Sequence, residues 1–167
     1  MAKYTEASLH LITDTISTLR RLLSQDPQFI SRLSASYLAG ELARLLVWTG
    51  AVPVRIDVVD GWWIIRSDKD WLAQTDGSVS LWNFHHIVWF PEAGREACRS
   101  EALLTAFADV VVTRGATDEV TWITGDGSRW VLPNEILDQF TQLKSGRIVA
   151  FRYSGDKARV SGDARPE

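Results

Sequence analysis

The chain has 167 residues, of which 46% are hydrophobic and 23% charged, a balance typical of one globular domain and unlike a disordered or fibrous chain. Its formal net charge of -3 offers no general attraction to phosphate backbones, which argues against nucleic acid as a partner. The single cysteine, Cys98, excludes an intrachain disulfide and a zinc site built from several thiolates, and it fits a reducing compartment.

Neither a membrane span nor a signal peptide is evident. No apolar run reaches the roughly 18 residues that cross a bilayer, and the N-terminal residues MAKYTEASLH lack the basic-then-apolar order of a signal peptide. We therefore expect a cytoplasmic protein that does not bind membranes. The pattern predicts one domain over residues 1–153 and a flexible, polar tail over residues 154–167.

The first third of the chain predicts two helices. Apolar residues recur at steps of three and four over residues 5–24, the period of a helix with one buried face. Asp26 and Pro27 then supply an N-cap and a first-turn proline for a second helix that runs to about Trp48, and Gly50 closes it. The short join between the helices favours an antiparallel helical hairpin.

Alternating apolar residues from Val52 onward indicate a strand, and Asp60-Gly61 is a strong signal for a type I′ turn of a β-hairpin. A two-residue loop fixes the register. It places Val59 opposite Trp62, Val58 opposite Trp63, Asp57 opposite Ile64 and Ile56 opposite Ile65. The face with Asp57, Trp62 and Ile64 mixes polar and apolar residues, so we expect it to lie on the outside.

The rest of the chain continues as a mixture of strands and helices. Residues 67–77 form a polar connection, residues 79–90 a long strand, and residues 92–108 a third helix that includes Cys98. Strands are predicted at 109–113, 119–124, 129–132 and 147–153, and a fourth helix from Pro133-Asn134 to Leu143. The expected class is α+β, with a mainly antiparallel sheet, an N-terminal helical hairpin and two further helices.

The candidates for chemistry are weak. His85 and His86 are adjacent on the predicted strand and would point to opposite faces, so they are poorly placed to bind one metal ion. Carboxylates around the start of the third helix, Glu92 among them, are better explained by ordinary surface pairs and by the helix dipole. We predict no catalytic group, no metal site and no cofactor.

The eight tryptophans are the most unusual feature of the composition. Core packing is the default role of an indole, but aromatic anchors next to acidic groups also suit an interface with a basic protein surface. The predicted partner-binding residues are Asp57, Trp62, Ile64, Trp71 and Trp89.

Three functional hypotheses follow. The first is a non-enzymatic protein-binding domain, in its most concrete form a bacterial immunity-type inhibitor of a cognate toxin. The alternative is an enzyme or small-ligand-binding domain with a pocket lined by tryptophans and by His85, His86 and Glu92. The third is a homo-oligomer that buries the mixed hairpin face against its own copy.

Overall fold

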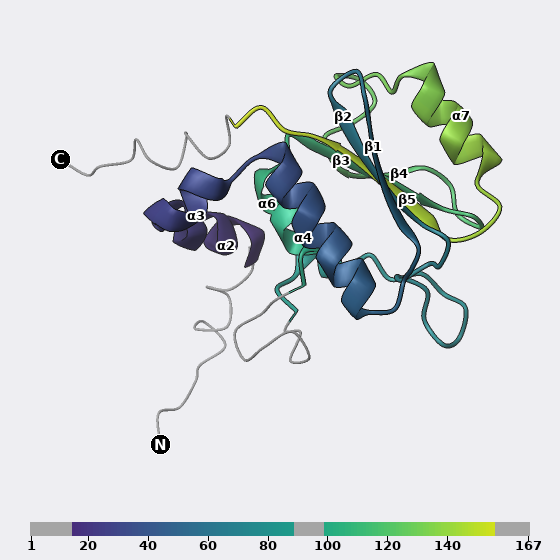
Figure 1. Cartoon of the computed structure of the whole chain (residues 1–167), viewed down its shortest axis with the longest axis horizontal. Coiled ribbons are helices and arrows are strands. Elements are labelled where there is room, and N and C mark those ends of the chain that lie inside the picture. Colours follow the sequence, from purple (N-terminus) through teal and green to yellow (C-terminus); the bar gives the residue numbers. More distant parts are fainter. Residues whose placement is uncertain (1–14, 89–98, 156–167) are drawn as a thin grey trace.

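A computed structural model describes residues 15–88 and 99–155 of the chain, and Figure 1 shows their arrangement. Five strands form one sheet in the order β1-β2-β5-β3-β4, and every neighbouring pair is antiparallel. The helices α2, α3, α4 and α6 lie on one side of this sheet, and α7 lies on the other. The predicted α+β class with a mainly antiparallel sheet is confirmed.

The N-terminal helices are α2 (Thr15–Ser24), α3 (Pro27–Arg32) and α4 (Ala35–Trp48). Asp26 caps α3 as predicted, since its side chain accepts a hydrogen bond from the backbone of Gln28. The single helix predicted from 27 to 48 is wrong, because the chain leaves the helical conformation after α3. The side chain of Ser34 then accepts from the backbone nitrogen of Tyr37 and starts a new helix.

A Schellman motif ends α4. Gly50 has φ +70°, its nitrogen donates to the carbonyl of Val47, and the nitrogen of Ala51 donates to the carbonyl of Leu46. The prediction that Gly50 closes this helix is therefore confirmed. The motif turns the chain directly toward the first strand.

The hairpin of β1 (Val54–Val59) and β2 (Trp62–Ser67) has the predicted register. Both turn residues have positive φ, 49° at Asp60 and 77° at Gly61, as a type I′ turn requires. Because the loop has two residues, Val59 faces Trp62 and each following pair is fixed. Local turn chemistry thus determines this part of the fold.

The long strand predicted over residues 79–90 is wrong. Val79 makes only an isolated bridge with Ala73, and the chain then forms the single helical turn α5 (Trp82–His85). Aromatic and β-branched residues favour a strand, but here they pack a short turn against α6 (Glu101–Phe107). The described part of the predicted third helix is α6, while Cys98 lies outside the described residues.

The C-terminal part consists of β3 (Val110–Gly115), β4 (Thr121–Thr124), α7 (Asn134–Gln142) and β5 (Arg147–Arg152). The strand predicted over residues 129–132 is absent from the described structure. Instead the Asp126 carboxylate accepts from the backbone nitrogens of Ser128 and Arg129, and the chain continues toward α7 without pairing. The predicted C-terminal tail lies almost wholly outside the described residues.

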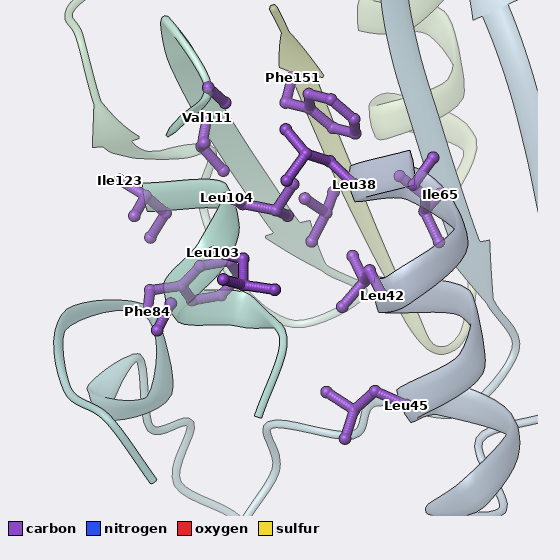
Figure 2. Packing of buried hydrophobic residues seen from close by; sticks show 14 of the residues in the cluster. Leu38, Leu42, Leu45, Ile65, Phe84, Leu103, Leu104, Val111, Ile123 and Phe151 are labelled. Atoms are coloured by element: carbon purple, nitrogen blue, oxygen red, sulfur yellow. The ribbon is translucent and has the colours of Figure 1, made fainter. Parts of the chain in front are cut away.

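The larger core lies between the sheet and the helices α2, α4 and α6, and Figure 2 shows part of it. Leu38, Leu42 and Leu45 of α4 point toward side chains of α6 and of the sheet. Their spacing of three and four residues explains why one face of α4 is buried. A second core covers the opposite sheet face and consists of Trp62, Ile64, Val110, Val112, Leu132, Ile136, Phe140, Leu143, Ile148 and Ala150.

This second core overturns the expectation that the mixed hairpin face lies outside. Trp62 and Ile64 are each 1% exposed, because α7 covers the β2 part of that face. Arg55 and Asp57 belong to the same face but lie on β1, where they are exposed. This face of the hairpin is mixed in composition because its β2 side chains are mainly apolar and buried, while its β1 side chains are mainly polar and exposed.

Candidate functional site

Only part of the predicted partner-binding set lies on the surface. Asp57 is exposed, whereas Trp62 and Ile64 are buried and have no access to a partner in this fold. Trp71 is half-buried against the larger core, and its indole nitrogen has no hydrogen-bond partner among the described residues. Trp89 lies outside the described residues. These five side chains therefore do not form one surface.

The two histidines of the alternative pocket lie at the end of α5 rather than on a strand. The ring of His86 stacks on Trp82, with centroids 3.3 Å apart and planes 2° from parallel. Its Nδ1 is 3.1 Å from the Trp82 carbonyl, and because a carbonyl only accepts, the proton of this bond belongs to Nδ1. His85 is exposed, and Glu92 lies outside the described residues. These contacts of His86 are thus local ones, made with Trp82 at the start of α5.

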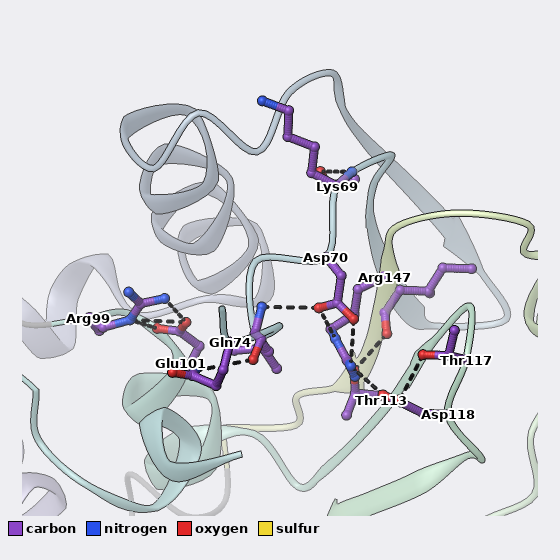
Figure 3. A network of polar contacts seen from close by, with 12 residues as sticks. Lys69, Asp70, Gln74, Arg99, Glu101, Thr113, Thr117, Asp118 and Arg147 are labelled. Atoms are coloured by element: carbon purple, nitrogen blue, oxygen red, sulfur yellow. Dashed lines mark hydrogen bonds and ion pairs between the residues drawn. The ribbon is translucent and has the colours of Figure 1, made fainter. Parts of the chain in front are cut away.

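A buried arginine joins three separate segments, as Figure 3 shows. Arg147, the first residue of β5, is 1% exposed, and its Nε and Nη2 donate to Asp70 over 2.7 and 2.9 Å. Its Nη2 also contacts the carboxylate of Asp118, and its Nη1 donates to Thr113. These four contacts hold the guanidinium in place. Gly115 also lies against the guanidinium, because a Cβ added to this glycine would be 2.7 Å from Nη2.

The Arg147 cluster is best explained as a structural clamp. It links the loop after β2 and the loop after β3 to the start of β5. An arginine fork between two carboxylates satisfies most of its own donors, which leaves little for a ligand. Sequence reasoning missed this cluster, because its members are far apart in the chain and resemble ordinary surface charges.

The buried carboxylate of Glu101 has a similar structural explanation. Its side chain is fully buried and pairs with Arg99, whose Nη2 lies 2.7 Å from Glu101 Oε1. The expectation of an ordinary surface pair in this region is therefore wrong for Glu101, because its carboxylate pairs with Arg99 in the interior. Within residues 15–88 and 99–155, no three His, Cys, Asp or Glu side chains gather closely enough to hold a metal ion.

Two exposed carboxylates have lowered pKa values for local reasons. The hydroxyl of Ser78 donates to Asp76 and lowers the pKa of that carboxyl, and Ser128 does the same for Asp126. On α4, the hydrogen bond to Glu41 raises the pKa of Arg44. All three belong to turns or helix surfaces, so the shifts reflect local hydrogen bonding and not a shared site.

The surface with the clearest binding character is the free edge of β1. In the described part of the chain β1 pairs with β2 alone, so its other side carries unpaired backbone groups. Ile56 and Val58 on one face of the strand are 43% and 54% exposed, and Arg55 and Asp57 lie exposed on the other. Among the predicted residues, only Asp57 belongs to this surface, which we call the β1 edge (Val54–Val59).

More exposed apolar side chains lie at the end of α4 and just before β1. Val47, Trp48 and Val52 are each between 45% and 57% exposed. Isolated exposed apolar residues are normal on a protein surface, but a concentration of them marks an interaction site. With Ile56 and Val58 added, half of the large exposed hydrophobic residues in the described chain come from α4, β1 and the loop between them.

None of the helices in the described ranges is long and apolar enough to cross a membrane. Comparison with protein-family models, with curated proteins and with solved structures finds no match to this chain.

Proposed function

We propose that this chain is a non-enzymatic protein-binding domain and that the β1 edge is its binding surface. The observation that carries the proposal is an edge strand with exposed apolar side chains and free backbone groups. A partner in extended conformation adds a strand to such an edge, with backbone hydrogen bonds for affinity and side-chain contacts for specificity. The proposed partner has a basic surface, which suits the net charge of -3 and the exposed Asp57.

The most concrete version of this proposal is a cytoplasmic bacterial immunity-type inhibitor that occupies a cognate toxin. Such a protein needs a stable body and one well-formed contact surface, and it needs no catalytic group of its own. Two cores on the two faces of the sheet supply the stable body. The exposed apolar residues of β1 and of the end of α4 supply the contact surface.

Affinity capture of the tagged chain from its native lysate tests the proposal. Ile56→Lys places a charge on the edge, and Val131→Lys is the matched control, because Val131 is 83% exposed and lies outside β1. We expect one protein to be recovered by the parent and by Val131→Lys, and to be lost with Ile56→Lys. Equal recovery by all three, or recovery of no protein, contradicts the proposal.

The alternative of an enzyme or small-ligand-binding domain stays a hypothesis. It is tested by screening small molecules for a rise in melting temperature, which a ligand of the native state produces by mass action. A ligand whose effect disappears in both His85→Ala and His86→Ala supports the alternative. A ligand that is insensitive to both substitutions argues against the proposed pocket.

A further inference from the structure

The backbone of β1 alternates between its two sides. In a hairpin with a two-residue loop, the residues next to the loop form a hydrogen-bonded pair, and every second pair does the same. Val59, Asp57 and Arg55 therefore direct their N–H and C=O groups toward β2. The corresponding groups of Val54, Ile56 and Val58 point away from the sheet, where no described strand pairs with them.

The two edges of the sheet differ in how well they are protected from further pairing. The strand at the other edge, β4, has only four residues, and its pairing with β3 shifts register between Val111 and Val112. Short strands and irregular pairing are devices that prevent unwanted strand addition. The β1 edge has six residues in regular register and contains neither proline nor lysine. It is therefore the less protected of the two edges.

The geometry points to a second copy of this chain as that partner, paired antiparallel along β1 about a two-fold axis at Ile56. This inference rests on one part of the proposed function, namely that the β1 edge is the binding surface. It names a second copy as the occupant of that edge, so self-pairing and the proposed basic partner compete for the same backbone groups. In this register Ile56 faces its own copy, and Val54 faces Val58 of the other copy. These are the residues whose backbone groups point outward, so the pairing forms three hydrogen-bonded pairs without changing the fold of either copy.

The charges of β1 favour the same register. Arg55 and Asp57 lie one residue on either side of Ile56. An axis at Ile56 therefore places Arg55 of each copy directly opposite Asp57 of the other, which makes two cross-strand ion pairs on one face. On the opposite face Val54, Ile56 and Val58 of both copies form a continuous apolar row. A strand with this sequence is complementary to itself in charge, in apolar pattern and in backbone direction.

The surface of α4 also suits a second copy. The helix contacts both β1 and β2, and copies related by this axis would bring two α4 helices to about 10 Å apart on the same face. The flank of α4 opposite its buried leucines carries small or exposed residues, namely Ser36, Gly40, Ala43 and Val47.

Gly40 is informative on this flank. It lies inside a helix, where glycine is less favourable than alanine by about 1 kcal/mol. A Cβ added at Gly40 would meet nothing within 4 Å, so packing within the described chain does not require a glycine there.

Charge reversal of β1 tests the inference by sedimentation equilibrium of the full chain. The parent is expected to have twice the chain mass of 18.7 kDa. Arg55→Asp makes β1 wholly acidic and Asp57→Arg makes it wholly basic, so each variant alone is expected to dimerise about tenfold more weakly or worse. Mixing the two restores both ion pairs, so the mixture is expected to form a heterodimer of parental affinity. Glu119→Arg, an exposed charge reversal near β4, is the control and stays dimeric.

Each outcome is decisive. A parent that sediments as a monomer overturns the inference, as does a parent dimer that neither single variant weakens. Rescue in the mixture shows that both variants are folded and that the two charges meet across the interface. Weakened single variants without rescue contradict the register about Ile56.

Disulfide trapping provides a second measurement that is independent of charge. In a Cys98→Ser background, Ile56→Cys would lie opposite itself at about 5.5 Å between Cα atoms, a separation that a disulfide spans. Val58→Cys would face Val54 instead, and its two copies would be about 13 Å apart along the strands. We expect a covalent dimer only from Ile56→Cys. Equal trapping of both variants, or none, overturns the inference.

The failure of this inference is distinguishable from failure of the proposed function. If the parent is a monomer and Ile56→Lys still loses a captured protein, the edge binds a different partner and only the self-pairing is wrong. If the parent dimerises through β1 and the capture recovers no other protein, the self-pairing stands and the immunity-type proposal is wrong.

Discussion

Arg147 and Asp70 are 77 positions apart in the chain, yet the guanidinium of one meets the carboxylate of the other through two nearly parallel hydrogen bonds of 2.7 and 2.9 Å. The arginine is almost fully buried, and Asp118 contacts the same guanidinium from a second loop. The loops after β2 and β3 are therefore joined to the start of β5, the last strand of the sheet in chain order, by a charge cluster as well as by strand pairing.

Removing the arginine should destabilise the fold strongly. Arg147→Ala leaves Asp70 and Asp118 close together without their shared cation, and breaking a buried ion pair in this way costs about 3 kcal/mol. Arg44→Ala removes an exposed pair with Glu41 and should cost about 0.5 kcal/mol. Urea unfolding of both variants and the parent measures the difference. Equal losses would show that the cluster does not act as a clamp.

A side chain at Gly115 should disturb the same cluster. The Cβ of Gly115→Ala would lie 2.7 Å from Arg147 Nη2, 2.8 Å from Asp70 Oδ2 and 2.9 Å from Asp118 Oδ2. We expect a loss of about 1–3 kcal/mol, because the ion pairs must move apart to admit a methyl group. Gly127→Ala is the matched control, since its nearest neighbour, a carbon of Trp122, lies at an ordinary 3.5 Å. Its melting temperature should stay close to that of the parent, and an equal drop would contradict the steric explanation.

The two tryptophans with opposite exposure should respond differently to truncation. Trp62 is 1% exposed within the second core, so Trp62→Ala should destabilise the protein by about 3–5 kcal/mol. Trp82 is 59% exposed and stacks mainly on His86, so Trp82→Ala should cost less than about 1 kcal/mol. Thermal unfolding followed by circular dichroism distinguishes them. A mild effect at Trp62 would mean that α7 does not cover the sheet.

The carboxyl of Asp126 should titrate below the usual range for aspartate. The Ser128 hydroxyl and two backbone nitrogens donate to its ionised form and lower its pKa. The stability linked to this shift is present above the unfolded pKa and is lost as the pH falls through the lower folded pKa. Ser128→Ala should raise the Asp126 pKa toward its ordinary value, and NMR titration of the side-chain carboxyl measures it. An unchanged pKa would exclude the serine as its main cause.

Local signals predicted well wherever the deciding atoms are neighbours in the chain. Asp60-Gly61 fixed the type I′ turn and with it the whole β1–β2 register, because positive φ at both positions leaves few alternatives. Asp26 and Gly50 marked a helix start and a helix end through bonds to residues within four positions. The fold class and the approximate order of the helices and strands followed from the hydrophobic periodicity of the sequence.

Two of the failed predictions, the helix over residues 27–48 and the strand over residues 79–90, arose from ambiguous local patterns. The stripe over residues 27–48 fits one helix, but Ser34 competes for the backbone and starts a new helix by capping Tyr37. The aromatic run over residues 79–90 favours a strand by propensity, yet its described part has no neighbouring strand to pair with. Secondary structure there depends on which surface is available for packing.

The sequence by itself therefore determined the class, the β1–β2 hairpin and several helix ends, through interactions of short range. Only the tertiary structure decided the strand order, the burial of Trp62 beneath α7, the Arg147 cluster and the free edge of β1. The hairpin sequence does not indicate which of its two faces α7, an element much later in the chain, will cover. The sequence also does not indicate that charged residues as distant as Asp70 and Arg147 will form an ion pair. Exposure is a property of the assembled sheet, and the candidate binding surface is defined by exposure.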